Sequence, residues 1–164
     1  MGLFTRDGRG NGDGDGGERS VAGYEVAKTD QEWKEQLTPE RYAVLRKAGT
    51  EPAWTGKLLH VDGAGVFHCA GCDAALFDSD AKFDSGSGWP SFDRPLGERT
   101  IVERSDRSHG MVRTEVLCAT CGGHLGHVFP DGPTDTGMRY CINSLSMTYA
   151  GTGAGDEAGG DTQA

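Results

Sequence analysis

Two Cys-x-x-Cys pairs constrain the fold of this chain more than any other feature of its sequence. The first pair is Cys69 and Cys72, and the second is Cys118 and Cys121. Four thiolates in two such pairs are the donor set of a closed tetrahedral zinc site, with each sulfur about 2.3 Å from the ion. The stretch between the pairs is far longer than the gap of about 15 to 20 residues in compact zinc modules. We therefore predict one structural zinc ion that joins two remote hairpins of a larger sheet domain.

Disulfides and redox-active pairs are the alternatives to zinc. Two disulfides are disfavoured in a reducing compartment, and a redox Cys-x-x-Cys requires a strand and helix context that the sequence lacks. Neither alternative accounts for two such pairs. Because an ion held by four thiolates has no open coordination position, we expect it to stabilise the fold and not to act as the catalyst.

Length and charge narrow the classes of function. The 164 residues allow one domain, which we predict at residues 23–150, between disordered Gly-rich tails at residues 1–22 and 151–164. A formal charge of -9 argues against nucleic acid or an anionic membrane as partner, because both bind clustered Lys and Arg side chains. Together with the wide cysteine spacing, it also disfavours a zinc ribbon that acts on nucleic acid.

The chain has no run of about 18 apolar residues and no apolar segment of a secretion signal at its start. We therefore expect a protein of the cytoplasm, where its thiols stay reduced, and we expect a monomer.

Short helices followed by strands are expected along the chain. Thr29 and Glu32 form a capping-box pattern that opens a first short helix. Thr38 and Pro39 supply the N-cap and the first residue of a second one. Beyond Thr55 the sequence consists of short runs rich in Val, Ile, Phe and Thr, punctuated by Gly, Asp and Pro. These runs predict that strands dominate the rest of the domain.

Three strands can be placed next to the cysteines. Residues 58–61 and 65–68 flank Asp62-Gly63-Ala64 and are expected to form a hairpin that leads into the first pair. Residues 111–117 are expected to form a strand that leads into the second pair.

The fifth cysteine, Cys141, lies in a further predicted strand. A period of two places Arg139, Cys141 and Asn143 on one face, so that a cation and an amide flank the thiol. A nearby positive charge or His raises the ionised fraction of a thiol, which makes Cys141 a candidate nucleophile. The alternative is that Cys141 is simply a small buried apolar residue.

His124 and His127 follow the second cysteine pair directly. On a regular strand these two side chains face opposite ways, so a shared site requires a bulge or bend, for which Gly126 supplies the freedom. One His as a metal ligand is the competing interpretation. The Gly-rich loop at residues 85–92 carries Trp89, which is either a core residue or part of a binding site.

Taken together, these motifs resemble the B-type peptide methionine sulfoxide reductases, which reduce the R epimer of methionine sulfoxide. The resemblance covers roughly residues 25–150. The matching stretches are Thr50-Glu51-Pro52, Thr55-Gly56, the two cysteine pairs, residues 85–92 (SGSGWPSF), Leu96, residues 108–111 (SHGM), residues 124–133 (HLGHVFPDGP) and residues 139–144 (RYCINS).

The resemblance implies a fold and a set of roles. The fold is mainly β, with two antiparallel sheets packed as a zinc-stabilised tent and short N-terminal helices. Cys141 matches the nucleophile, and the two His and Asn143 match residues that shape the site and help to protonate the sulfoxide oxygen. Trp89 matches the aromatic wall of the substrate site, in which we also place Arg139, and the paired cysteines match the zinc ligands. The reaction leaves a sulfenic acid on Cys141 and serves protein repair under oxidative stress.

One position departs from the family pattern. Many members carry a resolving cysteine where this chain has Ser87, and the other four thiols are predicted to bind metal. We therefore predict that an external thiol, either a small molecule or a thioredoxin-like protein, reduces the sulfenic acid directly. A zinc-stabilised tent that only binds a partner, with Cys141 inert, is the alternative from another functional class.

Overall fold

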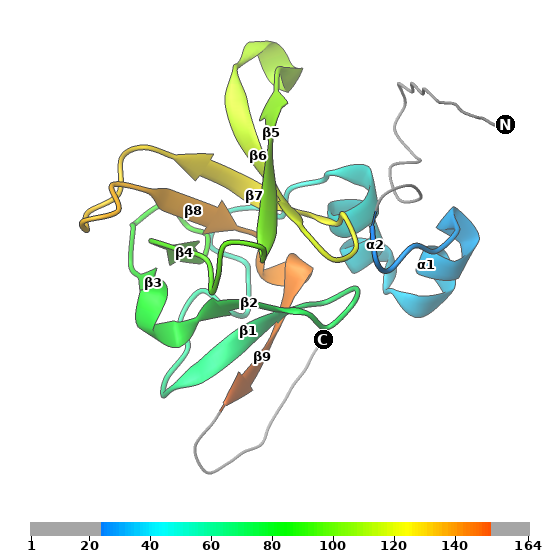
Figure 1. The fold of residues 1–164 in the computed structure, drawn as a ribbon, viewed down its shortest axis with the longest axis horizontal. Coiled ribbons are helices and arrows are strands. Elements are labelled where there is room, and N and C mark those ends of the chain that lie inside the picture. The colour runs from blue at the N-terminus through cyan, green and yellow to red at the C-terminus, as the bar shows by residue number, and fades with distance from the viewer. Residues whose placement is uncertain (1–23, 152–164) are drawn as a thin grey trace, which may run out of the picture.

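The computed structural model describes residues 24–151, in which two short helices precede two antiparallel sheets (Figure 1). The mainly β fold is therefore as predicted. The helices are α1 (Asp30–Gln36) and α2 (Pro39–Lys47). The strands are β1 (Gly65–Cys69), β2 (Ala75–Asp78), β3 (Lys82–Phe83), β4 (Ser91–Phe92), β5 (Ile101–Asp106), β6 (Arg113–Cys118), β7 (His124–Phe129), β8 (Arg139–Ile142) and β9 (Met147–Gly151). Short 3₁₀ turns are η1 (Ser79–Ala81), η2 (Ser108–Gly110) and η3 (Ser144–Ser146).

The predicted tails at residues 1–22 and 151–164 lie outside the described residues, except for Gly151, which ends β9. The limits of the domain stay a prediction. Within residues 24–151 no helix has the length and apolar character needed to cross a membrane.

Both helices begin at the predicted caps. The Thr29 hydroxyl accepts a hydrogen bond from the Glu32 backbone N–H at 3.1 Å, and the Glu32 carboxylate accepts one from the Thr29 N–H at 2.9 Å. In α2, which has Pro39 as its first residue, the Thr38 hydroxyl accepts a hydrogen bond from the Arg41 backbone N–H at 3.2 Å. These bonds satisfy backbone donors that have no partner inside a helix.

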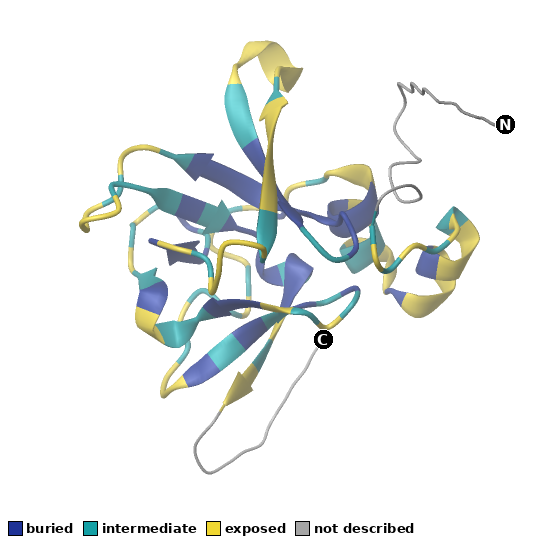
Figure 2. Cartoon of the chain, viewed as in Figure 1, coloured by how far each residue is buried: buried dark blue, intermediate teal, exposed yellow. Residues whose placement is uncertain are grey.

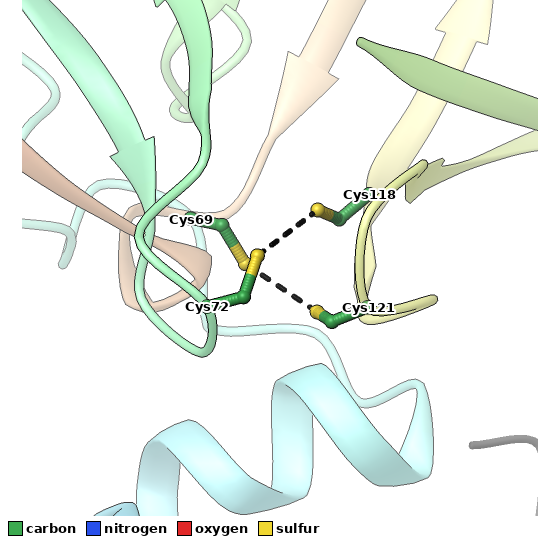
Figure 3. A group of neighbouring side chains, drawn as sticks. All are labelled: Cys69, Cys72, Cys118 and Cys121. Carbon is green, nitrogen blue, oxygen red and sulfur yellow. Dashed lines mark hydrogen bonds between the residues drawn. The ribbon is translucent and has the colours of Figure 1, made fainter. Parts of the chain in front are cut away.

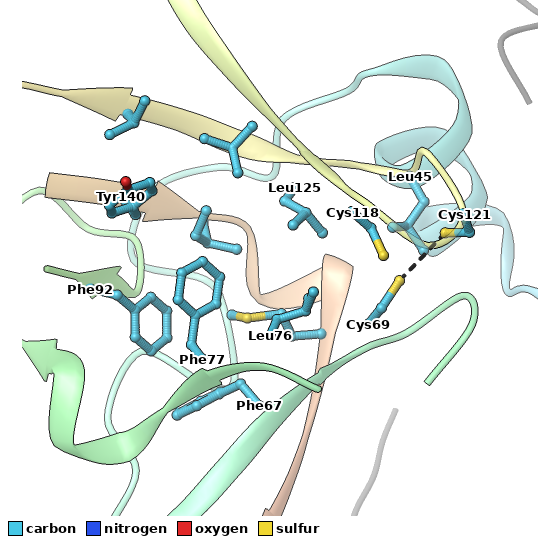
Figure 4. Close-up of a cluster of buried hydrophobic side chains, with 14 of the residues drawn as sticks. Leu45, Phe67, Cys69, Leu76, Phe77, Phe92, Cys118, Cys121, Leu125 and Tyr140 are labelled. Carbon is cyan, nitrogen blue, oxygen red and sulfur yellow. Dashed lines mark hydrogen bonds between the residues drawn. The ribbon is translucent and has the colours of Figure 1, made fainter. Parts of the chain in front are cut away.

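The two sheets face each other across one hydrophobic core. The smaller sheet has the strand order β2-β1-β9, and the larger has the order β3-β4-β8-β7-β6-β5. Phe67 of β1 meets Phe92 of β4 edge to face at a centroid distance of 5.0 Å, and Phe77 of β2 stacks on Phe92 at 4.3 Å (Figure 4). The large sheet is buried along β7 and exposed along β5 (Figure 2). This is the predicted tent of two packed sheets.

The predicted hairpin before the first cysteine pair is wrong. Residues 58–61 are not a strand, and β1 pairs with β2 on one side and with β9 on the other. The last described strand therefore occupies the edge that a local hairpin would have used. The segment instead packs on the core and is tied to a distant turn, where the Leu58 N–H donates to the Ser144 hydroxyl at 3.2 Å.

The strand before the second pair is confirmed, but it begins at Arg113 and not at Met111. Met111 and Val112 lie exposed in the turn that joins β5 to β6, where Val112 is 73% exposed.

Candidate active site

The two cysteine pairs meet at one end of the core (Figure 3). Cys69 and Cys118 end β1 and β6, and Cys72 and Cys121 lie in the turns that follow. The Sγ atoms of Cys69 and Cys121 are 3.7 Å apart, those of Cys72 and Cys118 are 3.6 Å apart, and all four lie within 4.8 Å of one another. Sulfurs about 2.3 Å from a tetrahedral ion are about 3.8 Å apart, whereas a disulfide bond is about 2 Å long. The four cysteines are positioned to bind one metal ion.

The surroundings of this cluster suit negatively charged sulfur. The Gly71 N–H donates to the Cys69 sulfur at 3.3 Å. The buried Arg46 guanidinium donates to the Cys121 carbonyl oxygen at 3.1 Å and lies 3.8 Å from its sulfur. Because β1 belongs to the small sheet and β6 to the large one, an ion at this place would connect the two sheets.

Cys141 lies in a polar row that crosses the large sheet. In the strand register, Cys141 of β8 is paired with Ser91 of β4 on one side and with His127 of β7 on the other. His127 is paired in turn with Glu115 of β6, and Glu115 with Arg104 of β5. Residues directly opposite each other in neighbouring strands share a face of the sheet. The next row points into the core and holds buried Phe92, Tyr140 and Val128.

A β-bulge brings the two histidines to this face. Val116 pairs with Gly126 and Leu117 pairs with His124, so Leu125 is an extra residue in β7. The His124 and His127 rings consequently lie 5.5 Å apart, which confirms the predicted bulge.

Gly126 is required for a reason that the sequence did not reveal. A Cβ atom at this position would lie 2.0 Å from the Cys141 carbonyl oxygen. Because β7 approaches β8 this closely, a larger residue at this position would force the two strands apart.

Each histidine is held by a buried or half-buried carboxylate. His124 Nδ1 lies 2.7 Å from Glu115 Oε2, and His127 Nε2 lies 2.7 Å from Asp106 Oδ2. A carboxylate at one ring nitrogen places the proton there and leaves the other nitrogen to act. His124 Nε2 is buried without a hydrogen-bond partner among the described residues. The sequence analysis missed both carboxylates, because only the strand pairing shows which acid lies beside which His.

The charges around His127 set its protonation. Burial lowers the pKa of His127, and Asp106 raises it only in part. Burial alone would raise the pKa of Asp106, but hydrogen bonds from His127 and Ser108 hold it well below its ordinary value. Asp106 also lies 3.5 Å from Arg113. The pair is therefore a neutral imidazole beside an ionised carboxylate near neutral pH.

The Cys141 thiol is half-buried, and burial raises its pKa. The Ser87 hydroxyl, 3.9 Å from the sulfur, and the Arg139 guanidinium both lower the pKa. Arg139 therefore lowers the pKa of Cys141 as predicted, but burial raises the pKa by more. Arg139 is also bound by both oxygens of Asp131, at 2.9 and 3.2 Å, and lies over the Phe129 ring.

Glu51 connects the Gly-rich loop at residues 85–92 to the end of β8. Its carbonyl oxygen accepts from the Trp89 indole N–H at 2.9 Å, and its N–H donates to the Asn143 side-chain oxygen at 3.0 Å. Its buried carboxylate accepts from the N–H groups of Ser144 and Leu145, each at 2.9 Å. The Asn143 amide nitrogen donates to the Leu125 carbonyl oxygen at 3.0 Å, so both polar atoms of Asn143 hold the backbone in place. The structure thus brings Trp89 and Asn143 together through a residue to which the sequence analysis gave no role.

Comparison with known proteins agrees with this arrangement. The SelR domain family matches residues 37–151. Three relatives carry the name "Peptide methionine sulfoxide reductase MsrB". The protein of Leptospira interrogans is 56% identical over 126 residues, which cover 77% of this chain and 96% of the relative. The protein of Bradyrhizobium diazoefficiens is 57% identical over 122 residues, which cover 74% of this chain and 88% of the relative. The protein of Chromohalobacter salexigens is 56% identical over 125 residues, which cover 76% of this chain and 94% of the relative.

This chain belongs to the B-type peptide methionine sulfoxide reductases. The reductase is accordingly an oxidoreductase of the peptide-methionine (R)-S-oxide reductase class. Its chain also overlaps the solved Mis18 "Yippee-like" domain, with a TM-score of 0.46 and 21% identity over 56% of this chain and 99% of that one.

A cavity of about 330 Å³ in the reductase does not have Cys141 in its lining. It lies beside β1 and β3, where Phe67, Ser79 and Lys82 contribute to its walls. None of the residues of the polar row lines it. The candidate active site is therefore a feature of the sheet face and its loops rather than of this cavity.

Proposed function

We propose that the reductase converts the R epimer of peptide-bound methionine sulfoxide to methionine through a sulfenic acid on Cys141, in protein repair and defence against oxidative stress. The observation that supports this most is the register of the large sheet, which pairs Cys141 with His127 and places the carboxylate-bound histidines on the same face. A nucleophile opposite a base that is oriented by a carboxylate is the arrangement that nucleophilic catalysis requires.

In the first step the neutral His127 ring accepts the Cys141 proton. The raised pKa of Cys141 keeps the thiol protonated at rest, so a base is needed, and the lowered pKa of His127 keeps that base available. Asp106 binds Nε2, which leaves Nδ1 to exchange the proton. The ionised Asp106 stabilises the imidazolium that forms.

The thiolate then attacks the sulfoxide sulfur, and the proton held by His127 goes to the sulfoxide oxygen. The S–S bond formed in this attack breaks again as the hydroxyl moves from the substrate sulfur to the Cys141 sulfur, so the substrate loses its S–O bond and Cys141 gains one. The substrate sulfur gains two electrons and leaves as methionine, while Cys141 loses two electrons and becomes a sulfenic acid. His124, on the same face of the sheet, helps to protonate the sulfoxide oxygen. Trp89 packs against the substrate methyl group, and Arg139 is a candidate neighbour of the bound substrate.

Regeneration uses an external thiol, either a small molecule or a thioredoxin-like protein. Ser87 lies 3.9 Å from the Cys141 sulfur and has no thiol to offer. The remaining cysteines form the metal cluster. Two external thiols therefore reduce the sulfenic acid to the thiol and leave as a disulfide, with release of water. Detection of an internal disulfide by mass spectrometry after one turnover would contradict this route.

The metal of the cluster is zinc in this proposal. The four sulfurs, their spacing and the adjacent Arg46 guanidinium fit a closed thiolate site, and a zinc ion held there supplies cohesion between the sheets. It takes no part in the reduction. A monomer in the cytoplasm that binds neither nucleic acid nor membranes stays a prediction from the sequence.

A reductase assay on the separated R and S epimers, with dithiothreitol as the reductant, tests the function. We expect turnover of the R epimer alone, and loss of turnover in Cys141→Ser with unchanged metal content and circular dichroism. Activity in the Ser variant would refute the mechanism. An inactive wild-type protein that still folds and holds metal would favour a binding module with an inert Cys141.

A further inference from the structure

Trp54 is an exposed aromatic residue with an unusual backbone conformation. Its side chain is 61% exposed, although an indole carries more apolar surface than most side chains. Its φ angle is +70°, in the left-handed region. Among residues 24–151 only three other non-glycine residues have a positive φ, namely Ala48, Asp73 and His109. A bulky aromatic residue in this region is strained, and such strain is concentrated at functional sites.

The contacts of Trp54 place it next to the Gly-rich loop at residues 85–92. The Trp54 N–H donates to the Gly88 carbonyl oxygen at 2.8 Å. A Cβ atom on Gly88 would lie 2.8 Å from the Ala53 Cβ and 3.0 Å from the indole nitrogen of Trp54. A side chain at position 88 would meet both Ala53 and the Trp54 indole, so glycine at this position lets the Trp54 segment lie this close to the loop.

Gly88 lies between a residue next to the nucleophile and the residue proposed as the aromatic wall. Ser87 precedes it, 3.9 Å from the Cys141 sulfur, and Trp89 follows it. The same chain segment holds Trp89 from the other side, because the Glu51 carbonyl oxygen accepts the Trp89 indole N–H. Trp54 therefore stands at the rim of the site on the rigid segment that positions its aromatic wall.

The substrate has to pass over this rim. Only a short aliphatic stem separates the sulfoxide sulfur from the Cα atom of the oxidised methionine. When the sulfur reaches Cys141, the peptide chain on either side of the methionine must run across the residues that surround the site. An exposed, rigid indole offers a flat apolar surface to a side chain of that peptide at low cost in conformational entropy.

We propose that Trp54 is a specificity-determining residue, a platform that binds an apolar or aromatic side chain next to the oxidised methionine in a peptide substrate. This rests on the proposed function and extends it, because it makes the sequence around the oxidised methionine a determinant of repair. The contact lies away from the reacting atoms, so it acts on substrate binding and appears in KM more than in kcat.

The experiment compares two R-sulfoxide substrates with dithiothreitol as the reductant. One is a short blocked peptide in which leucine or phenylalanine flanks the oxidised methionine, and the other is the N-acetyl, N-methylamide derivative of the single residue. In Trp54→Gly we expect the ratio of kcat/KM for the peptide to kcat/KM for the single residue to fall about fivefold, the usual size of an aromatic contact. Trp54→Phe should retain most of the ratio.

Stability separates this role from a structural one. Glycine adopts a positive φ without strain, so Trp54→Gly should melt no lower than the wild-type protein while its selectivity falls. Leu96→Ala is the matched control, because Leu96 is 45% exposed but is tied through its backbone to Leu76 of β2, in the other sheet. It should leave the ratio unchanged.

An unchanged ratio of the two kcat/KM values in Trp54→Gly would overturn the proposal. If kcat/KM fell equally for both substrates and the melting temperature fell too, Trp54 would have only a structural role. Wild-type protein without activity on either substrate would instead refute the proposed function, and the inference with it. The two failures are therefore distinguishable.

Discussion

At the scale of single residues, the Cys141 thiol lies among groups that change its pKa in opposite directions. Burial raises the pKa most, and the Glu51 carboxylate adds to that effect. The Ser87 hydroxyl and the Arg139 guanidinium act the other way. In the proposed mechanism, a thiol in this balance stays protonated at rest, and the neighbouring histidines activate it.

Two substitutions should shift the Cys141 pKa in opposite directions. Ser87→Ala removes a group that favours the thiolate and should raise the pKa, whereas Glu51→Gln removes a negative charge and should lower it. The pH dependence of Cys141 alkylation by iodoacetamide measures both, with circular dichroism as the check on folding. Shifts in the same direction would contradict this account of the site.

Asp106 should act through His127. In Asp106→Asn the His127 ring loses the carboxylate that raises its pKa against burial, so the pKa should fall further. The acidic limb of the kcat/KM profile should then move to lower pH, and kcat/KM should fall at least about tenfold. Asp73→Asn is the control, because Asp73 pairs with His68 at 3.9 Å on the exposed surface. An unmoved acidic limb would show that Asp106 has only a structural role.

At the scale of elements, the contact between β7 and β8 decides whether the site exists. The bulge in β7 turns His124 to the face of Cys141, and Gly126 lets the Cys141 backbone approach. The β8 strand carries Cys141 and leads into the turn that begins at Asn143. Its pairing with β7 therefore fixes the positions of both residues.

Gly126→Ala should therefore disturb both stability and activity. A Cβ atom 2.0 Å from a backbone oxygen forces the strands apart, which should cost about 1 to 3 kcal/mol of unfolding free energy. Urea denaturation and the R-epimer assay measure the two effects. Gly97→Ala is the control, because its nearest contact is an ordinary 3.5 Å, and it should change stability by less than about 0.5 kcal/mol. Equal stabilities of the two variants would contradict the close-approach argument.

Elements governed by local chemistry were predictable. The caps at Thr29 and Thr38 depend on atoms within a few residues, and both helices begin at those caps. The hairpin predicted at residues 58–68 does not form. Its turn pattern is local, but the edge of β1 is occupied by β9, which comes from the far end of the domain. A sheet edge pairs with the strand that buries more apolar surface, and the apolar area that two competing strands would bury cannot be read from a local stretch of sequence.

At the scale of the whole molecule, the four-cysteine cluster lies where the two sheets meet. Cys69 ends β1 of the small sheet and Cys72 follows it, whereas Cys118 ends β6 of the large sheet and Cys121 follows it. Binding an ion at this junction favours the folded state, because the four sulfurs come together only there.

Removal of the metal should therefore loosen the packing of the sheets. We expect about one zinc per chain by elemental analysis, and a melting temperature at least about 10 °C lower after treatment with a strong chelator or in Cys118→Ser. Cys141→Ser is the matched cysteine control and should keep both the metal and the melting temperature. Loss of metal in that variant would mean that Cys141 is a ligand.

The sequence by itself identified the candidate residues of the site. Paired cysteines, a lone cysteine beside Arg139 and Asn143, and two histidines after a turn are patterns of residue type and spacing, which are visible without coordinates. Only the tertiary structure decided what surrounds them. The carboxylates that hold the histidines, the Glu51 bonds that join Trp89 to Asn143 and the exposed Trp54 beside Gly88 all depend on which strands and loops become neighbours. Those neighbours are set by burial summed over the whole core, and no short stretch of sequence contains that sum.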